Sequence, residues 1–189
     1  MGKLIYTLNV TLDGFVETPD RSLDWTVIDD ELHAWFNEHT ASVDASLYGR
    51  GLYETMAAYW PTAQSDPDAT ETMREYAVIW NRTPRYVFST TLETVEHNSE
   101  LIRGGDIGEA LERIRAERTG DLEVGGARLA HQFIARGLVD EYWMVVHPVV
   151  IGAGTPYFPP GGPPHRLELL QTRTFGSGAV LLAYRRSGD

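Results

Sequence analysis

Two kinds of apolar pattern alternate along almost the whole chain. Short runs rich in β-branched residues, which favour strands, are followed by stripes of apolar residues at helical spacing. The predicted strands cover residues 3–12, 42–48, 85–89, 100–102, 121–124 and 138–151, and the predicted helices are centred on residues 32–39, 52–59, 73–80, 107–114 and 127–136. This alternation predicts a mainly parallel sheet with helices on both faces.

The C-terminal end departs from the alternation. A Gly/Pro-rich loop over residues 152–164 is followed by two strand-like runs, which Gly176-Ser177-Gly178 separates. Glycines between two such runs indicate a hairpin, and a hairpin is antiparallel. The predicted fold class is therefore α/β, with a mixed, mostly parallel sheet that ends in an antiparallel C-terminal hairpin.

The length of 189 residues suits one domain rather than two. The Pro-rich stretches at residues 61–68 and 152–164 are too short to act as linkers and are expected to be surface loops. We therefore predict a single domain over residues 1–189.

Composition excludes several classes of function. The chain has no cysteine, so it forms no disulfide, thiolate zinc site or cysteine nucleophile, and its six histidines lack paired metal-ligand spacing. A net charge of -11 repels phosphate backbones, so nucleic acid is not an expected partner. No apolar run reaches the ~18–20 residues of a membrane span, and residues 1–6 lack the features of a signal peptide. A cytoplasmic protein with no metal site and no membrane contact is expected.

The junction Gly125-Gly126-Ala127-Arg128-Leu129 is the sharpest local feature. It follows a predicted strand and opens a predicted helix. The glycines permit close backbone approach, and the free N–H groups of a first helical turn form an anion site, which suits a pyrophosphate. A tight turn without a ligand explains the glycine pair equally well. The G-x-G-x-x-G fingerprint is absent, so an ordinary Rossmann dehydrogenase is not expected.

Two further strand ends carry polar residues. Gly49 and Arg50 stand where a second strand meets a helix, and Arg50 is suited to pairing with a phosphate, although a solvated arginine beside a turn is the alternative. Ser89-Thr90-Thr91 ends a third strand and offers hydroxyls to a ribose phosphate. Taken alone, that segment is only a strand end.

Carboxylates gather near the first strand and the first helix. They are Asp13, Asp24, Asp29, Asp30 and Glu31. A reduced C=N or C=O bond gains a proton as well as a hydride, so a carboxylate that orients a heterocycle would be useful there. The alternatives are structural, because Asp13 before Gly14 suits an Asx turn and Asp29 suits a helix N-cap.

Taken together, the chain resembles the dihydrofolate reductase superfold, and within it the riboflavin-biosynthesis reductase branch. The resemblance covers nearly the whole chain. Its motifs are Thr11-Leu12-Asp13-Gly14-Phe15 (S-x-D-G), Tyr48-Gly49-Arg50-Gly51-Leu52-Tyr53-Glu54 (G-R-x-T-Y-E), Val87-Phe88-Ser89-Thr90-Thr91-Leu92 (V-x-S-R-T-L), and V-G-G-A-x-L, G-L-V-D-E and H-P-V-V-I-G-A-G-T-P-Y-F between Val124 and Phe158. It implies a three-layer sandwich and an NADPH-dependent reductase.

The resemblance also implies which residues hold the cofactor and substrate. The expected cofactor-binding residues are Gly14, Gly49, Arg50, Leu52, Ser89, Thr90, Gly125, Gly126, Ala127, Arg128 and Leu129. Asp13 would border the nicotinamide and substrate pocket, and Asp13 and Asp30 are the expected catalytic carboxylates. Trp25 is an expected substrate contact, although core packing is the alternative. The superfold often has a cis peptide bond between the paired glycines, here Gly125 and Gly126.

Two residues depart from the family pattern. Leu52 replaces a threonine and Thr90 replaces an arginine, which removes a hydroxyl and a positive charge from the expected phosphate site. NADPH is the expected cofactor, with its preference over NADH left open. The zinc deaminase half of the bifunctional family members is absent, because it requires cysteines.

These observations predict an NADPH-dependent reductase of a small heterocycle, similar to the 5-amino-6-(5-phosphoribosylamino)uracil reductase of riboflavin biosynthesis. There are two alternatives. One is a reductase of pterin (dihydrofolate-like) substrates, and the other is a non-catalytic protein that binds a dinucleotide or an antifolate-type ligand. Leu52 and Thr90 favour the non-catalytic reading. From the family alone, a homodimer is expected, formed through residues 138–151 or the closing hairpin.

Overall fold

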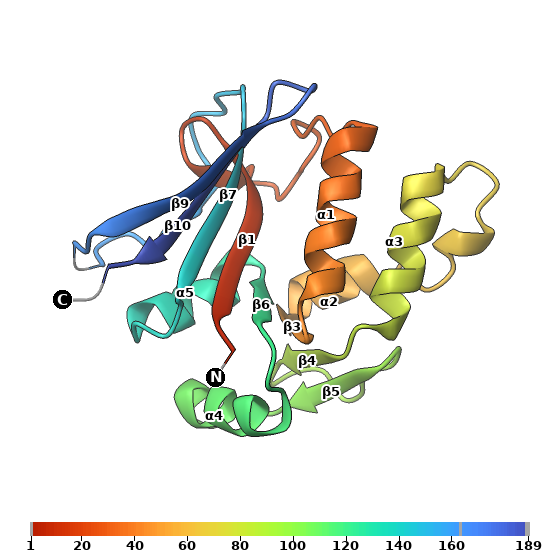
Figure 1. The fold of residues 1–189 in the computed structure, drawn as a ribbon. Helices are drawn as coiled ribbons and strands as arrows, with labels where there is room; N and C mark the ends of the chain where they lie inside the picture. Colours follow the sequence, from red (N-terminus) through yellow and green to blue (C-terminus); the bar gives the residue numbers. More distant parts are fainter. Residues whose placement is uncertain (1, 163, 188–189) are drawn as a thin grey trace.

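A computed structural model describes residues 2–162 and 164–187. Eight strands form one sheet in the order β5-β4-β3-β6-β1-β7-β10-β9 (Figure 1). Their bounds are β1 Leu4–Thr11, β3 Ala45–Gly49, β4 Arg85–Phe88, β5 Ser99–Ile102, β6 Leu122–Gly125, β7 Glu141–His147, β9 Leu167–Thr174 and β10 Val180–Arg186. Two short strands, β2 (Phe15–Glu17) and β8 (Thr155–Pro156), form a separate ribbon.

The sheet is mixed in the predicted way. All neighbouring strands from β5 to β7 pair in parallel, whereas β10 is antiparallel to both β7 and β9. The last two strands form the expected hairpin across residues 175–179, where the N–H of Phe175 donates to the carbonyl of Ala179. The predicted antiparallel edge is therefore confirmed.

Helices cover both faces of the sheet, as predicted (Figure 1). They are α1 (Asp30–Ser42), α2 (Arg50–Ala57), α3 (Glu71–Arg82), α4 (Ile107–Glu117) and α5 (Ala127–Ala135), with a short 3-10 turn at Ala63–Ser65. Successive residues of a strand point to opposite faces. On β1, Tyr6 belongs to the core that contains Leu111 of α4 and Phe133 of α5, while the hydroxyl of Thr7 lies 3.0 Å from Nε2 of His39 on α1. These contacts define a three-layer sandwich.

Two predicted strands are shorter in the structure. The strand predicted over residues 138–151 is reduced to β7, because the N–H of Leu138 still bonds to Phe133 at the end of α5 and Pro148 has no N–H to donate. The strand predicted over residues 42–48 begins only at Ala45, because α1 continues to Ser42. The β2–β8 ribbon was not predicted, since segments of two or three residues carry no readable periodicity.

Candidate active site at the carboxyl edge of the sheet

Four parallel strands place the predicted cofactor residues along one edge. Strands β4, β3, β6 and β1 are neighbours in the sheet, so their carboxyl ends lie in a row. Tyr48 of β3 pairs with Gly125 of β6, which sets the two strand-to-helix junctions side by side. A Cβ added to Gly49 would lie 3.5 Å from Cβ of Leu129. Segments far apart in the sequence thus meet at the β3–β6 boundary.

The chain leaves β3 and β6 toward opposite faces of the sheet. Leu52 and Met56 of α2 pack with Tyr48 on one face, whereas Phe133 of α5 packs with Leu47 on the other. Adjacent parallel strands whose helices depart to opposite faces define a topological switch point, where open α/β sheets bind ligands. The fold therefore places the candidate site between α2 and α5.

The caps of the helices distinguish this edge from the rest of the molecule. Asp29, Thr70 and Asp106 cap α1, α3 and α4, and each side chain accepts an N–H of the first turn. The caps of α2 and α5 are Gly49 and Gly126, which provide no side-chain acceptor. The first-turn N–H groups of these two helices therefore remain available to an anion, and the helix dipoles favour negative charge there.

The paired glycines adopt a tight junction with a trans peptide bond. No cis peptide bond occurs in the described part of the chain, so the prediction of a cis bond between Gly125 and Gly126 is wrong. Instead, Gly126 has a φ of 87°, a conformation that favours glycine. A Cβ on Gly125 would come within 2.5 Å of Cδ2 of Leu52 and 3.1 Å of the Tyr48 ring. Leu52, one of the predicted cofactor residues, therefore packs directly against Gly125.

Two arginines at this edge lack partners. Arg50 is the first residue of α2 and Arg128 is the second residue of α5, and both side chains are exposed. Across residues 2–162 and 164–187, neither makes a hydrogen bond or an ion pair. In a chain of net charge -11, such unpaired cations beside free helix N-termini suit a phosphate-bearing ligand. The other residues of that junction, Ala127 and Leu129, are buried.

Ser89 and Thr90 follow β4 at the same edge. The N–H of Ser89 bonds to the carbonyl of Ile102 on β5. The Ser89 hydroxyl oxygen accepts the N–H groups of Thr91 and Leu92, so it shapes its own turn. Thr90 is exposed. The structure thus gives Ser89 a local structural role beside its predicted role in binding.

Asp13 ties two loops together at the end of β1. Its carboxylate accepts the Thr11 hydroxyl at 2.6 Å and the N–H groups of Ile151 and Gly152 at 3.3 and 2.7 Å. These hydrogen bonds, that of Thr11 first, lower the pKa of Asp13. Gly14 follows with a φ of 89° and completes the turn. Asp13 is therefore an ionised acceptor at neutral pH rather than a proton donor.

The predicted substrate-side residues lie on the segment between β2 and α1 and at the first position of α1. The ring of Trp25 meets the edge of the His147 ring, with centroids 5.5 Å apart, and its Nε1 is buried without a partner in the described structure. Asp30 opens α1 with an exposed side chain. Next to it, Asp29 accepts the N–H of Leu32, so the predicted N-cap is confirmed.

Sequence reasoning assigned no role to His147. It is the last residue of β7, is 1% exposed, and lies beside Thr11 in the sheet register. Its Nδ1 accepts the N–H of Val27 at 3.4 Å, and its Nε2 lies 2.8 Å from Oδ1 of Asn9. Burial lowers the pKa of His147. Only the pairing of β7 with β1 reveals that this histidine holds the Trp25 segment over the carboxyl edge.

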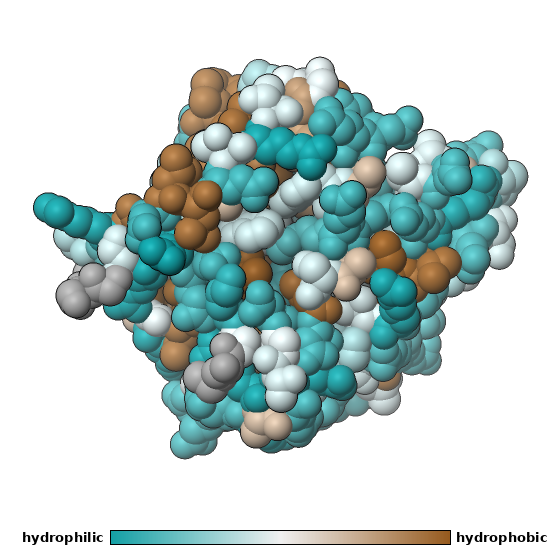
Figure 2. Space-filling view, in the orientation of Figure 1, coloured by the Kyte–Doolittle hydropathy of each residue, from teal (hydrophilic) through white to brown (hydrophobic). Residues whose placement is uncertain are grey.

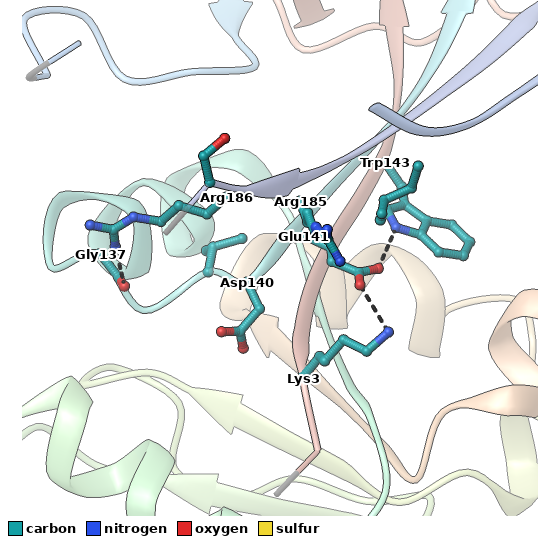
Figure 3. A pocket seen from close by; sticks show the side chains of 10 residues that line it. Lys3, Gly137, Asp140, Glu141, Trp143, Arg185 and Arg186 are labelled. Atoms are coloured by element: carbon teal, nitrogen blue, oxygen red, sulfur yellow. Dashed lines mark hydrogen bonds and ion pairs between the residues drawn. The ribbon is translucent and has the colours of Figure 1, made fainter. Parts of the chain in front are cut away.

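A hollow lies at the opposite end of the sheet. A pocket of about 670 Å³ opens near the start of β1 and β7 (Figure 3). Glu141 in it accepts Lys3 Nζ at 2.8 Å and Trp143 Nε1 at 2.9 Å, and the bond to Glu141 raises the pKa of Lys3. Its polar groups thus satisfy one another, and it lies away from the strand ends where such sheets bind ligands.

The described residues contain no group of three or more His, Cys, Asp or Glu side chains placed to hold a metal ion. Within the same residues, no helix is long and apolar enough to cross a membrane.

The fold defines an α/β protein in which two glycine-capped helices begin on adjacent parallel strands at a switch point. The chain belongs to the RibD C-terminal domain family, whose model matches residues 2–181. It is 34% identical to the uncharacterized protein YyaP of Bacillus subtilis (strain 168), over 98% of this chain and 96% of that protein. It is 28% identical to YwjB of the same organism, over 98% of each chain.

Two solved structures share the fold of this chain. A riboflavin biosynthesis protein from Shewanella sp. PV-4 superposes with a TM-score of 0.78 at 19% identity and covers 98% of this chain and 99% of its own. A Thermotoga maritima deaminase/5-amino-6-(5-phosphoribosylamino)uracil reductase superposes with a TM-score of 0.67 at 18% identity, and the match covers 98% of this chain and 57% of that longer one. These superpositions show that the chain shares the fold of those two proteins.

Proposed function

We propose that the protein is an NADPH-dependent reductase of a small heterocycle, with a pyrimidine of the riboflavin pathway or a related pterin as substrate. One observation carries the proposal. Two helices with glycine caps begin on adjacent parallel strands, and each presents an unpaired arginine, Arg50 or Arg128, at its first turn. Membership of the RibD C-terminal domain family supports the reductase class.

The residues at the edge fit a dinucleotide. The first-turn N–H groups after Gly49 and Gly126 would hold the pyrophosphate, and Arg50 and Arg128 would neutralise its charge. Ser89 and Thr90 would lie toward the adenosine ribose, and Gly14 toward the nicotinamide. When bound, the dihydronicotinamide supplies the hydride.

The carboxylates contribute orientation rather than protons in this proposal. Asp13 is held ionised by Thr11 and two backbone N–H groups, so it orders the loops that border the substrate. Asp30, exposed at the first turn of α1, is free to accept a hydrogen bond from a heterocycle N–H. Trp25 would contact the substrate ring.

The test measures turnover and binding together. The purified protein is mixed with NADPH or NADH and with pyrimidine and pterin substrates, and absorbance at the dihydronicotinamide band is followed. Loss of absorbance with a pyrimidine or pterin supports the proposal. A protein that gains no thermal stability from either reduced nicotinamide and oxidises neither contradicts it.

A non-catalytic dinucleotide-binding protein is the second candidate, and two substitutions favour it. Leu52 and Thr90 replace a threonine and an arginine of the family pattern, whereas the glycine-capped helix ends remain. Thermal stabilisation by NADPH without oxidation, across the same substrates, would favour this candidate over the reductase.

We also propose a homodimer, formed along the closing hairpin. Strand β7 has neighbours on both sides, so it offers no free edge to a second copy. Of the two predicted dimer contacts, only the closing hairpin has a free edge. The outer strand β9 is an edge, and its Leu169 and Leu170 are 53% and 40% exposed, in a region where Figure 2 shows apolar surface. Light scattering of wild type and of Leu169→Lys tests this. A dimer that Leu169→Lys dissociates is expected, and a monomeric wild type contradicts it.

A further inference from the structure

A buried cation without a carboxylate lies far from the carboxyl edge. Arg85 is the first residue of β4 and is 2% exposed. Its guanidinium donates to the carbonyls of Trp80 and Thr83 and to the hydroxyl of Ser99, all of them neutral groups. No acidic side chain of the described chain forms an ion pair with it. An arginine keeps its charge even when buried, so in the described chain only neutral acceptors and the face of the Trp80 ring offset it.

Three hydrogen-bonding atoms around this cation lack partners. They are Nη2 of Arg85, Oγ of Ser46 and Nε1 of Trp80, which are three of the five such side-chain atoms in the described residues. Ser46 and Trp80 are each 1% exposed. A buried hydrogen-bonding atom without a partner is destabilising, so three around one residue are unexpected in a native interior.

The fold places Ser46 and Trp80 each against Arg85, with the hydroxyl of the buried Tyr48 also close to Ser46. Ser46 on β3 and Arg85 on β4 are register partners, so their side chains stand side by side on one face of the sheet. Trp80 comes from the last turn of α3, and its ring centroid lies 3.7 Å from Cζ of Arg85. The cluster stands at the amino ends of β3 and β4, the opposite end from the candidate active site.

We propose that Arg85, Ser46 and Trp80 form a binding site for one small monovalent anion of the halide class. The site offers N–H and O–H donors, which a halide accepts without directional demands. A single guanidinium balances one negative charge, so a divalent sulfate or phosphate would leave a buried negative charge uncompensated. Burial also excludes an anion that keeps its hydration shell. The bound anion would stabilise the packing of α3 against β3 and β4.

Thermal unfolding at constant sodium concentration tests the site. Gluconate, which is too large to enter, is replaced stepwise by chloride or bromide. We expect a saturable rise of Tm of about 3–6 °C at ten times the dissociation constant. Ser46→Ala removes one donor and should weaken halide affinity about threefold to tenfold. Arg113→Gln, which alters an exposed arginine paired with Glu100, should leave the halide response unchanged.

Two outcomes would overturn the proposal. The first is a wild-type Tm that does not respond to halide, or a response that Ser46→Ala leaves unchanged. The second is a bromide-soaked crystal in which the anomalous signal is absent between the three side chains, or in which a water occupies that point. Arg85→Met should abolish the response if it folds, and the Ser46→Ala and bromide results decide the matter if it does not.

Discussion

The carboxylate of Asp13 accepts the backbone N–H of Gly152 at 2.7 Å, across 138 intervening positions of sequence. This hydrogen bond joins the turn after β1 to the loop after β7, both at the carboxyl edge. It also explains why the pKa of Asp13 is lowered, together with the hydroxyl of Thr11, which has the larger effect. Asp13, which the family resemblance predicts to be catalytic, thus also links the two loops through hydrogen bonds.

Acid should break the hydrogen bonds between Asp13 and the loop after β7. A carboxylate whose pKa is lowered on folding stabilises the native loop above the pKa of its unfolded form, about 3.9, and that contribution is lost as pH falls through the lower folded value. The protection factors of the Ile151 and Gly152 amides, which compare hydrogen exchange with the intrinsic rate at each pH, should therefore fall below about pH 4. In Asp13→Asn, exchange should be fast already at neutral pH. Slow exchange at neutral pH in Asp13→Asn would show that the ionised carboxylate does not hold the loop.

Substitution of Gly125 should destabilise the protein through a clash with Leu52. An alanine Cβ at Gly125 would stand 2.5 Å from Cδ2 of Leu52 and 3.1 Å from the Tyr48 ring. Overpacking of this kind costs about 1–3 kcal/mol. Urea unfolding should show that loss for Gly125→Ala, and Leu52→Ala should restore part of it in the double variant. Additive losses in the double variant would contradict the proposed contact.

The two unpaired arginines should govern dinucleotide affinity. Arg50→Gln and Arg128→Gln each remove one cation from a helix N-terminus, and each should weaken NADPH binding about tenfold. Arg113→Gln is the matched control, because it changes the net charge equally at a surface ion pair. Fluorescence titration at two salt concentrations measures the effect. Equal affinities in all three variants would remove the phosphate role from this edge.

His147 should contribute to acid sensitivity. Burial lowers its pKa from about 6.5, so the unfolded chain binds a proton more readily than the native one. The free energy of unfolding should then be constant above about pH 6.5 and fall as pH drops toward the lower folded value. Chemical unfolding between pH 5 and 7.5 should show a shallower acid limb in His147→Gln than in wild type. Parallel curves would assign the acid sensitivity to other groups.

Much of the fold was predictable because its signals are local. Asp29 and the apolar stripe after it placed α1, and Gly176 to Gly178 placed the hairpin. The end of β7 was not predictable, since residues 148–151 are as apolar as the strand before them. The trans bond at Gly126 was also beyond the sequence, because a positive φ at one glycine makes the turn that resemblance had assigned to a cis peptide.

The sequence by itself determined the fold class, the family pattern and the glycine-rich strand ends, because periodicity, turn residues and motif spacing are properties of neighbouring residues. Tertiary structure decided which of those strand ends meet. The order of β4, β3, β6 and β1 sets Gly49 beside Leu129, places Leu52 against Gly125, and couples Asp13 to Gly152. Such contacts depend on strand order and on the helices between the strands, which arise only when the whole sheet assembles.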